Sequence, residues 1–140
     1  MKLFVDANTL MSGLVFEGNE SLLRDLGRLG VCELFANEYV REEVREVLAR
    51  PHLGLSRPDH ESALAIISRH VTILEDPPAD AVRNARGRVP DFDDLPVLVG
   101  FERSGCEYLV TVDRRFRERV PRAITTRAAI RRVLSGNESR

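Results

Sequence analysis

The stretch from residue 90 to residue 113 constrains the fold most, because it combines a helix start, a helix stop and a strand within 24 residues. Pro96 is compatible with a helix only in the first turn, where its missing N–H would have no partner in any case. The helix is therefore predicted to begin near Asp93 or Asp94. Gly105 is predicted to end it, since glycine readily adopts the left-handed conformation that closes many helices.

Two apolar runs along the chain each end at an aspartate. Residues 108–112 form a β-branched and aromatic run that is typical of a short buried strand, and Asp113 follows it. Residues 2–5 form a similar run before Asp6. In an open α/β sheet the carboxyl ends of the strands bind ligands, and helix N-termini gather at the same edge. We therefore expect Asp6 and Asp113 to lie close to each other.

Strand and helix patterns alternate along the rest of the chain. The pattern predicts a three-layer α/β/α sandwich with a central, mostly parallel sheet of about five strands. With 140 residues and 43% hydrophobic content, we expect a single domain over 1–140. Further strands are predicted at 31–36, 71–74 and 123–125, and helices at 10–15, 21–29, 38–48, 59–69, 80–86 and 127–134. A short helical or looped segment is predicted at 114–119.

An amphipathic helix is predicted after Asn37, which is a typical N-cap residue. Within it, Glu43 projects beside the buried apolar stripe, and an acid in such a place needs a partner. A salt bridge with Arg50 or Arg69, or simple exposure, would also explain this glutamate.

The residues after the first strand also have an ordinary structural explanation. Asn8 and Thr9 are expected to cap the helix that carries Leu10 and Leu14. Taken alone, Asp6 is more readily explained as a cap or turn residue than as a ligand.

Taken together, five acids fall at predicted strand ends or beside helix starts: Asp6, Glu43, Asp91, Asp94 and Asp113. Like charges in one crevice raise the free energy unless a cation neutralises them or some are protonated. An all-oxygen site favours Mg²⁺ or Mn²⁺. The matching reaction is metal-assisted phosphodiester hydrolysis, with Glu43 or Asp94 as candidates to orient the attacking water.

The charges are distributed unevenly. From Arg103 to the end, ten arginines stand against four acids, although the whole chain has a net charge of -1. We expect Arg114 and Arg115, next to Asp113, to contact a phosphate-bearing polymer. A solvated helix face or an acidic protein partner would give the same pattern.

The cysteines and the length of the apolar segments indicate where in the cell the protein is found. Cys32 and Cys106 have no metal-ligand spacing and are predicted to be buried, reduced thiols of a cytoplasmic protein. We expect no membrane association, since no apolar run approaches the length of a membrane span.

Four segments together resemble the acidic motifs of PIN domains, and the likeness covers nearly the whole chain. The segments are Val5-Asp-Ala-Asn-Thr-Leu10, Arg41-Glu-Glu-Val-Arg-Glu-Val-Leu48, Asp91-Phe-Asp-Asp94 and Val110-Thr-Val-Asp113. The resemblance implies catalytic roles for Asp6, Glu43, Asp94 and Asp113, and Mg²⁺ or Mn²⁺ ligands among Asp6, Asp91, Asp94 and Asp113. Asp91 is the extra acid of a subgroup with an Asp-x-x-Asp motif.

The same resemblance implies supporting roles for Asn8 and Thr111, which match polar residues that hold the acids or the metal-bound waters. Small members of the family are typically ribonuclease toxins of toxin–antitoxin pairs. An RNA substrate, a small antitoxin protein and a homodimer are therefore expected.

Three other functions are compatible with the pattern. One is a catalytically silent module that binds RNA or protein, and another is a housekeeping RNA-processing nuclease. The third is a small-molecule phosphohydrolase, although the Asp-x-Asp-x-Thr nucleophile motif of one such family is absent because position 8 is Asn.

Overall fold

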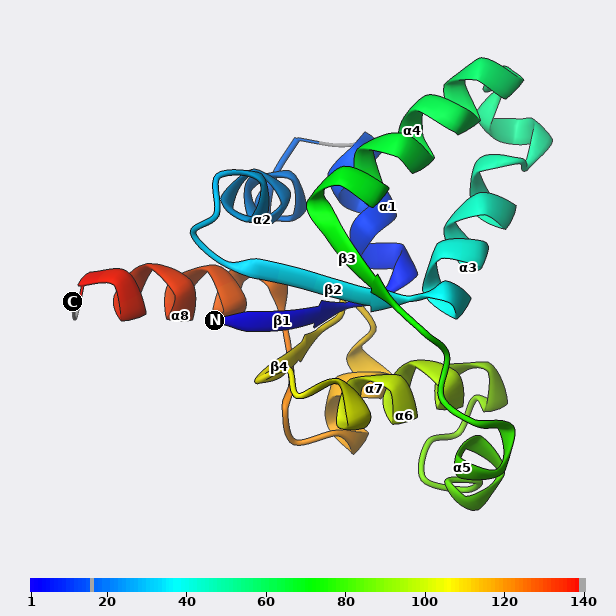
Figure 1. Ribbon diagram of the computed structural model, residues 1–140, viewed down its shortest axis with the longest axis vertical. Coiled ribbons are helices and arrows are strands. Elements are labelled where there is room, and N and C mark those ends of the chain that lie inside the picture. Colours follow the sequence, from blue (N-terminus) through cyan, green and yellow to red (C-terminus); the bar gives the residue numbers. More distant parts are fainter. Residues whose placement is uncertain (16, 139–140) are drawn as a thin grey trace.

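The computed structural model describes residues 1–15 and 17–138, in which a five-stranded sheet carries helices on both faces (Figure 1). The strand order is β3-β2-β1-β4-β5, and all four pairings are parallel. This confirms the predicted α/β sandwich. The strands are β1 (Lys2–Val5), β2 (Glu33–Asn37), β3 (Val71–Leu74), β4 (Tyr108–Val110) and β5 (Ala123–Ile124).

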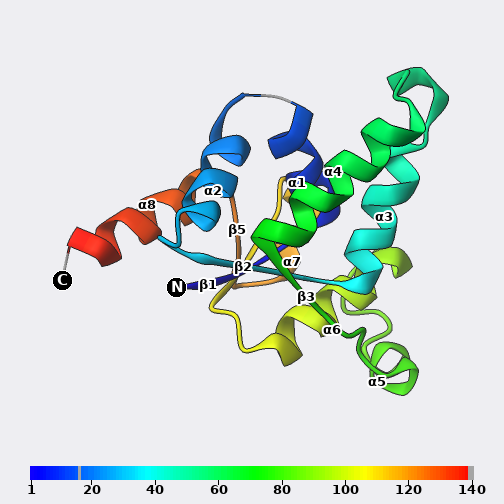
Figure 2. The same cartoon turned by 45° about the horizontal axis from the view of Figure 1, so that its top comes forward.

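Figures 1 and 2 show α1, α2 and α4 over one face of the sheet and α5 and α6 over the other. Helix α3 contacts α1, α4 and α6, and α8 packs beside α2. The α-helices are α1 (Ala7–Val15), α2 (Asn19–Arg28), α3 (Glu38–Leu48), α4 (Arg57–His70), α5 (Ala79–Asn84), α6 (Leu95–Ser104), α7 (Arg114–Arg119) and α8 (Thr126–Glu138). Two 3₁₀ turns are η1 (Pro51–Leu53) and η2 (Phe92–Asp94).

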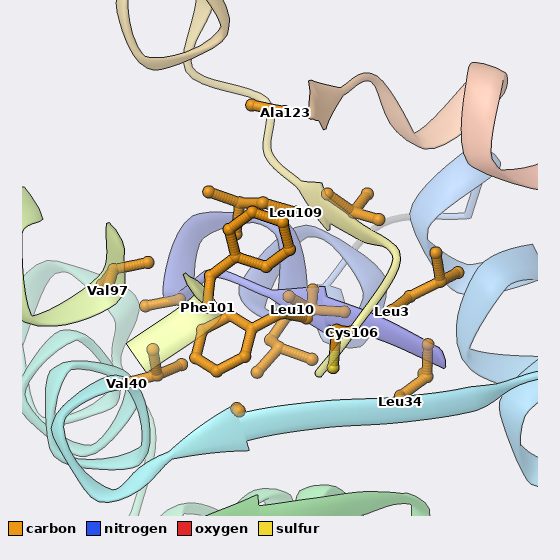
Figure 3. Packing of buried hydrophobic residues seen from close by; sticks show 14 of the residues in the cluster. Leu3, Leu10, Leu34, Val40, Val97, Phe101, Cys106, Leu109 and Ala123 are labelled. Atoms are coloured by element: carbon orange, nitrogen blue, oxygen red, sulfur yellow. The ribbon is translucent and has the colours of Figure 1, made fainter. Parts of the chain in front are cut away.

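The core lies on both faces of β1, whose residues 3–5 are almost fully buried. Figure 3 shows side chains of α6 and β4, among them Phe101 and Leu109, meeting in this cluster. The ring of Phe101 meets that of Phe4 edge to face at 6.3 Å, a favourable aromatic geometry. Cys32 and Cys106 are free and buried, as predicted.

Several element ends differ from the sequence prediction by one to four residues, and two of them lie next to Asp6 and Thr111. Helix α1 begins at Ala7, and its cap is Asp6, whose carboxylate accepts the Thr9 N–H, so the prediction that Asn8 and Thr9 cap it is wrong. Strand β4 ends at Val110 rather than at residue 112. The Val112 N–H donates to the Thr9 hydroxyl (3.2 Å), which draws the chain towards α1.

The helix predicted at 21–29 buries only part of its leucines. Leu23 and Leu26 are buried, but Leu22 and Leu29 are 44% and 64% exposed. Among the residues described, no helix is long and apolar enough to cross a membrane.

Asn37 joins the starts of α3 and α6. Its Oδ1 accepts the Val40 N–H (3.0 Å), which caps α3 as predicted, and its Nδ2 donates to the Pro96 carbonyl (3.2 Å). The side chain is fully buried, so both bonds are formed away from water. This approach requires glycine at position 100, where a Cβ atom would lie 2.5 Å from Asn37 Nδ2.

We predict that Gly100→Ala lowers the free energy of unfolding by about 1–3 kcal/mol, because the added methyl forces Asn37 away from Pro96. Urea unfolding measures this loss. Gly136→Ala in α8 is the control, since its Cβ would meet nothing within 4 Å, and it should be neutral or stabilising by up to about 1 kcal/mol. Equal stability of both variants would contradict the packing described.

Candidate active site

Asp6 lies where β1 ends, between β2 on one side and β4 on the other. The chain leaves β1 towards β2 and later returns to β4, so this is the switch point of the sheet, where open α/β proteins bind ligands. Asp6 is only 9% exposed. Its Oδ1 accepts the Thr9 N–H (3.0 Å) and the Thr9 hydroxyl (2.6 Å), and its Oδ2 accepts the Thr111 hydroxyl.

The two threonine hydroxyls also connect β1 to the segment after β4. Thr111 Oγ1 accepts the Asp113 N–H (3.0 Å), and Thr9 Oγ1 accepts the Val112 N–H (3.2 Å). Each hydroxyl therefore donates to Asp6 and accepts from a backbone N–H, which uses both of its hydrogen-bonding functions. The ends of the two strands are thereby held together through one buried carboxylate.

Asp113 and Asp91 are positioned by their own local backbones. Asp113 caps α7, with Oδ1 accepting the N–H groups of Arg115 (2.9 Å) and Phe116 (3.4 Å). Asp91 Oδ1 accepts the Asp93 N–H (2.9 Å) at the start of η2. Such turns are typical of aspartate before a helix.

Asp91, Asp94, Asp113 and Arg115 line one hollow of about 90 Å³. Phe116, the buried residue of α7, also lines this hollow and is only 3% exposed. Three carboxylates and one guanidinium therefore face the same small space.

Glu43 is half-buried on α3, and its pKa is raised to about 7, first by burial and then by the negative charges of Asp6 and Asp94. A hydrogen bond from the Tyr39 hydroxyl acts in the opposite direction. In the described part of the chain, neither Arg50 nor Arg69 forms an ion pair with Glu43, so the salt-bridge explanation is not supported.

Burial, followed by the charges of Asp91, Asp113 and Asp6, raises the pKa of Asp94 to about 6. The pKa of Asp6 is also raised, chiefly by burial and slightly by Asp113, against the hydrogen bonds from Thr111 and Thr9. The structure thus places Asp94 in the electrostatic field of Asp91, Asp113 and Asp6, and Glu43 in that of Asp6 and Asp94.

Of the two predicted supporting residues and the two predicted arginines, only one of each lies at the site. Thr111 is fully buried against Asp6, whereas Asn8 is exposed on α1. Arg115 lines the hollow, while Arg114 is exposed and pairs with Glu118 (3.1 Å).

The sequence prediction missed three residues of this site: Thr9, Tyr39 and Asp93. Thr9 stands three residues after Asp6, the spacing of an ordinary helix cap, and this was the available signal. Tyr39 stands four residues before Glu43, one helical turn away. Asp93 adds its charge to the field around Glu43 and Asp94.

The donors at this edge are carboxylate oxygens, which suit Mg²⁺ or Mn²⁺. Within residues 1–15 and 17–138, however, no group of three or more His, Cys, Asp or Glu side chains has an arrangement that could hold a metal ion. The donor chemistry therefore fits a hard cation, and the ligand positions would have to adjust to bind it.

Fold and site together define a parallel α/β protein with a group of acids at the carboxyl edge of its sheet. A sequence profile described as PIN domain matches residues 2–115, and the chain belongs to this family, as the four acidic segments indicated. PIN domains are typically nucleases. No curated protein matches the sequence.

Solved structures share the fold. That of PAE2754 from Pyrobaculum aerophilum is 24% identical, with a TM-score of 0.72 and 96% of each chain covered. That of VapC20 from Mycobacterium tuberculosis, a sarcin-ricin loop cleaving toxin, is 18% identical, with a TM-score of 0.60, and covers 83% of this chain and 93% of VapC20.

We predict that the metal-free protein loses stability as pH rises from about 4 to about 7. Glu43 and Asp94 have pKa values of about 7 and about 6 when folded, against ordinary values of 4.5 and 3.8, so the folded chain binds more protons in this window. Glu43→Gln should reduce this fall and raise the melting temperature at pH 8 in EDTA by on the order of a few degrees.

Scanning calorimetry across this pH range provides the measurement. Glu46→Gln, an exposed glutamate on the same helix, is the control and should follow the unmodified chain. An unchanged pH dependence in Glu43→Gln would show that this carboxyl is not in the acidic field.

Proposed function

We propose that the chain is an endoribonuclease that depends on Mg²⁺ or Mn²⁺ and hydrolyses RNA phosphodiester bonds. The observation that carries this proposal is that the negative charges of Asp6 and Asp94 act on Glu43, and those of Asp113 and Asp6 act on Asp94, at the carboxyl edge of the sheet. Four acids from four separate segments share one field there, in a chain of a family that typically cleaves nucleic acid. Their repulsion is a destabilising arrangement unless it serves to attract a cation.

The residues that would hold the ion are Asp6, Asp91, Asp94 and Asp113. The chemistry that the ion supplies when bound is charge stabilisation at a phosphate oxygen and activation of water. Glu43 has a pKa of about 7 and can accept a proton from the attacking water near neutral pH. Thr111 and Thr9 keep the Asp6 carboxylate in one orientation.

The biological setting that we propose is the toxin role in a type II toxin–antitoxin pair, in the cytoplasm and as a homodimer. One nuclease domain would span 1–140, since the solved structure of PAE2754 is covered over nearly its whole length. The likeness in fold to the VapC20 toxin supports the role, and a small antitoxin protein would then be the partner.

We predict that the purified chain cleaves labelled single-stranded RNA with Mn²⁺ and not with EDTA. Asp6→Asn, which removes a ligand of the ion, and Glu43→Gln, which removes the group that accepts the proton, should each lower the cleavage rate by about 100-fold or more. Glu46→Gln should cleave like the unmodified chain, as it is exposed on the same helix. The amount of cleaved product on a denaturing gel, followed over time, measures the rate.

A chromogenic phosphate ester tested in parallel separates the other functions. Hydrolysis of the ester without RNA cleavage would indicate a small-molecule phosphohydrolase. Metal-independent RNA binding without cleavage would indicate a silent binding module. Cleavage restricted to a precursor RNA and unaffected by any antitoxin would indicate a housekeeping nuclease and contradict the toxin role.

We predict that Arg115→Ala weakens single-stranded RNA binding and reduces the slope of log affinity against log salt by about 1, as expected for one lost phosphate contact. Arg114→Ala should act in the same direction but less, because this guanidinium already pairs with Glu118. Fluorescence anisotropy in EDTA at several salt concentrations measures both. Arg57→Ala, an exposed arginine at the start of α4, is the control, and an equal effect there would indicate unspecific charge attraction.

A further inference from the structure

Phe92 is placed unlike the other aromatic side chains. It is 53% exposed, whereas the remaining aromatic residues within 1–15 and 17–138 are buried or half-buried. A single exposed apolar side chain is normal on a protein surface and needs no functional explanation by itself. The residues around this ring, however, favour a role in binding.

One face of the ring is already occupied by a cation. The Arg86 guanidinium lies 5.3 Å from the centre of the Phe92 ring, within the range of a cation–π contact. With about half of the side chain still exposed, surface remains open to a second flat group. An arginine beside an aromatic ring provides both a stacking surface and a charge that attracts phosphate.

The segment that carries the ring is held in place by contacts before the ring and by a hydrogen bond within its turn. Before it, Arg88 forms a bidentate ion pair with Glu102 of α6 (2.5 and 2.8 Å), and Val89 is 5% exposed in the core. Within the turn, the Asp94 N–H donates to the Asp91 carbonyl (3.1 Å). The turn that carries Phe92 is therefore held in place, and the ring is exposed on it.

The ring also lies inside the acidic segment. Asp91 directly precedes Phe92 and Asp94 follows two residues later, and both line the hollow that Asp113 and Arg115 share. A base that stacks on Phe92 would therefore bring its own backbone phosphate next to the acids and the arginine.

We propose that Phe92, supported by Arg86, is a stacking platform for one unpaired base of the RNA beside the cleaved bond. The proposal rests on the proposed nuclease function and gives Phe92 and Arg86 a role in positioning its RNA substrate. A base within a double helix is already stacked on its neighbours, and only an unpaired base can be placed on a protein ring. Such stacking tolerates any base, so it selects for strandedness rather than for sequence.

The test compares Phe92→Leu, which keeps an apolar side chain but removes the ring, with Phe92→Trp, which keeps a ring. Affinity is measured by anisotropy in EDTA for a single-stranded RNA and for a blunt RNA duplex. Phe92→Leu should lower single-strand affinity by roughly 5- to 150-fold, and Phe92→Trp should retain it. Duplex affinity should be the same in all variants.

A 2-aminopurine base in the single strand reports stacking directly, since stacking quenches its fluorescence. The quenching should be lost in Phe92→Leu and kept in Phe92→Trp. Leu55→Ala, an exposed apolar residue on the loop between α3 and α4, is the matched control and should bind like the unmodified chain. Unchanged single-strand affinity in Phe92→Leu would overturn the proposal and would favour a protein partner at this ring.

Cleavage with Mn²⁺ separates this proposal from the nuclease function. If the chain cleaves RNA and Phe92→Leu has an unchanged kcat/KM, the platform is wrong and the nuclease stands. If no RNA is cleaved but Phe92→Leu loses binding and quenching, the platform stands and the nuclease is wrong.

Discussion

The carboxylate of Asp6 is largely removed from water, and the hydrogen bonds that compensate for its burial organise the rest of the site. A buried charge without such partners would be strongly destabilising. Thr9 and Thr111 supply the donors from two different elements, so satisfying Asp6 also brings the end of β1 to the segment after β4. Asp113 N–H donates in turn to Thr111, which carries this order into the start of α7.

Structural and chemical roles coincide in these acids. Asp6 caps α1 and Asp113 caps α7, and Asp91 turns the chain into η2, so each is held in place by ordinary local hydrogen bonds. Capping also sets the direction of each carboxylate, because helices that follow parallel strands begin at the ligand-binding edge. A cap residue at this edge is therefore available as a ligand, and the two explanations of Asp6 do not exclude each other.

The sequence predicted much of the fold, because short apolar runs and helix-stop residues are local signals. The strands at 2–5 and 71–74, the Asn37 cap and the Gly105 stop were confirmed. The contacts that shape the site are not local. Thr111 and Asp6 are 105 residues apart in the sequence, and Asn37 and Pro96 are 59 residues apart. Hydrophobic periodicity carries no information about such pairs, and the exposure of Leu29 shows that an apolar stripe alone overestimates burial.

The central proposal is that a divalent cation binds among these acids and relieves their repulsion. Calorimetric titration of the chain with Mg²⁺ at pH 6.5, in two buffers of different ionisation enthalpy, tests it most directly. With pKa values of about 7 for Glu43 and about 6 for Asp94, the account predicts saturable binding that releases on the order of one proton. Absence of saturable binding, or binding with no proton released, would contradict it.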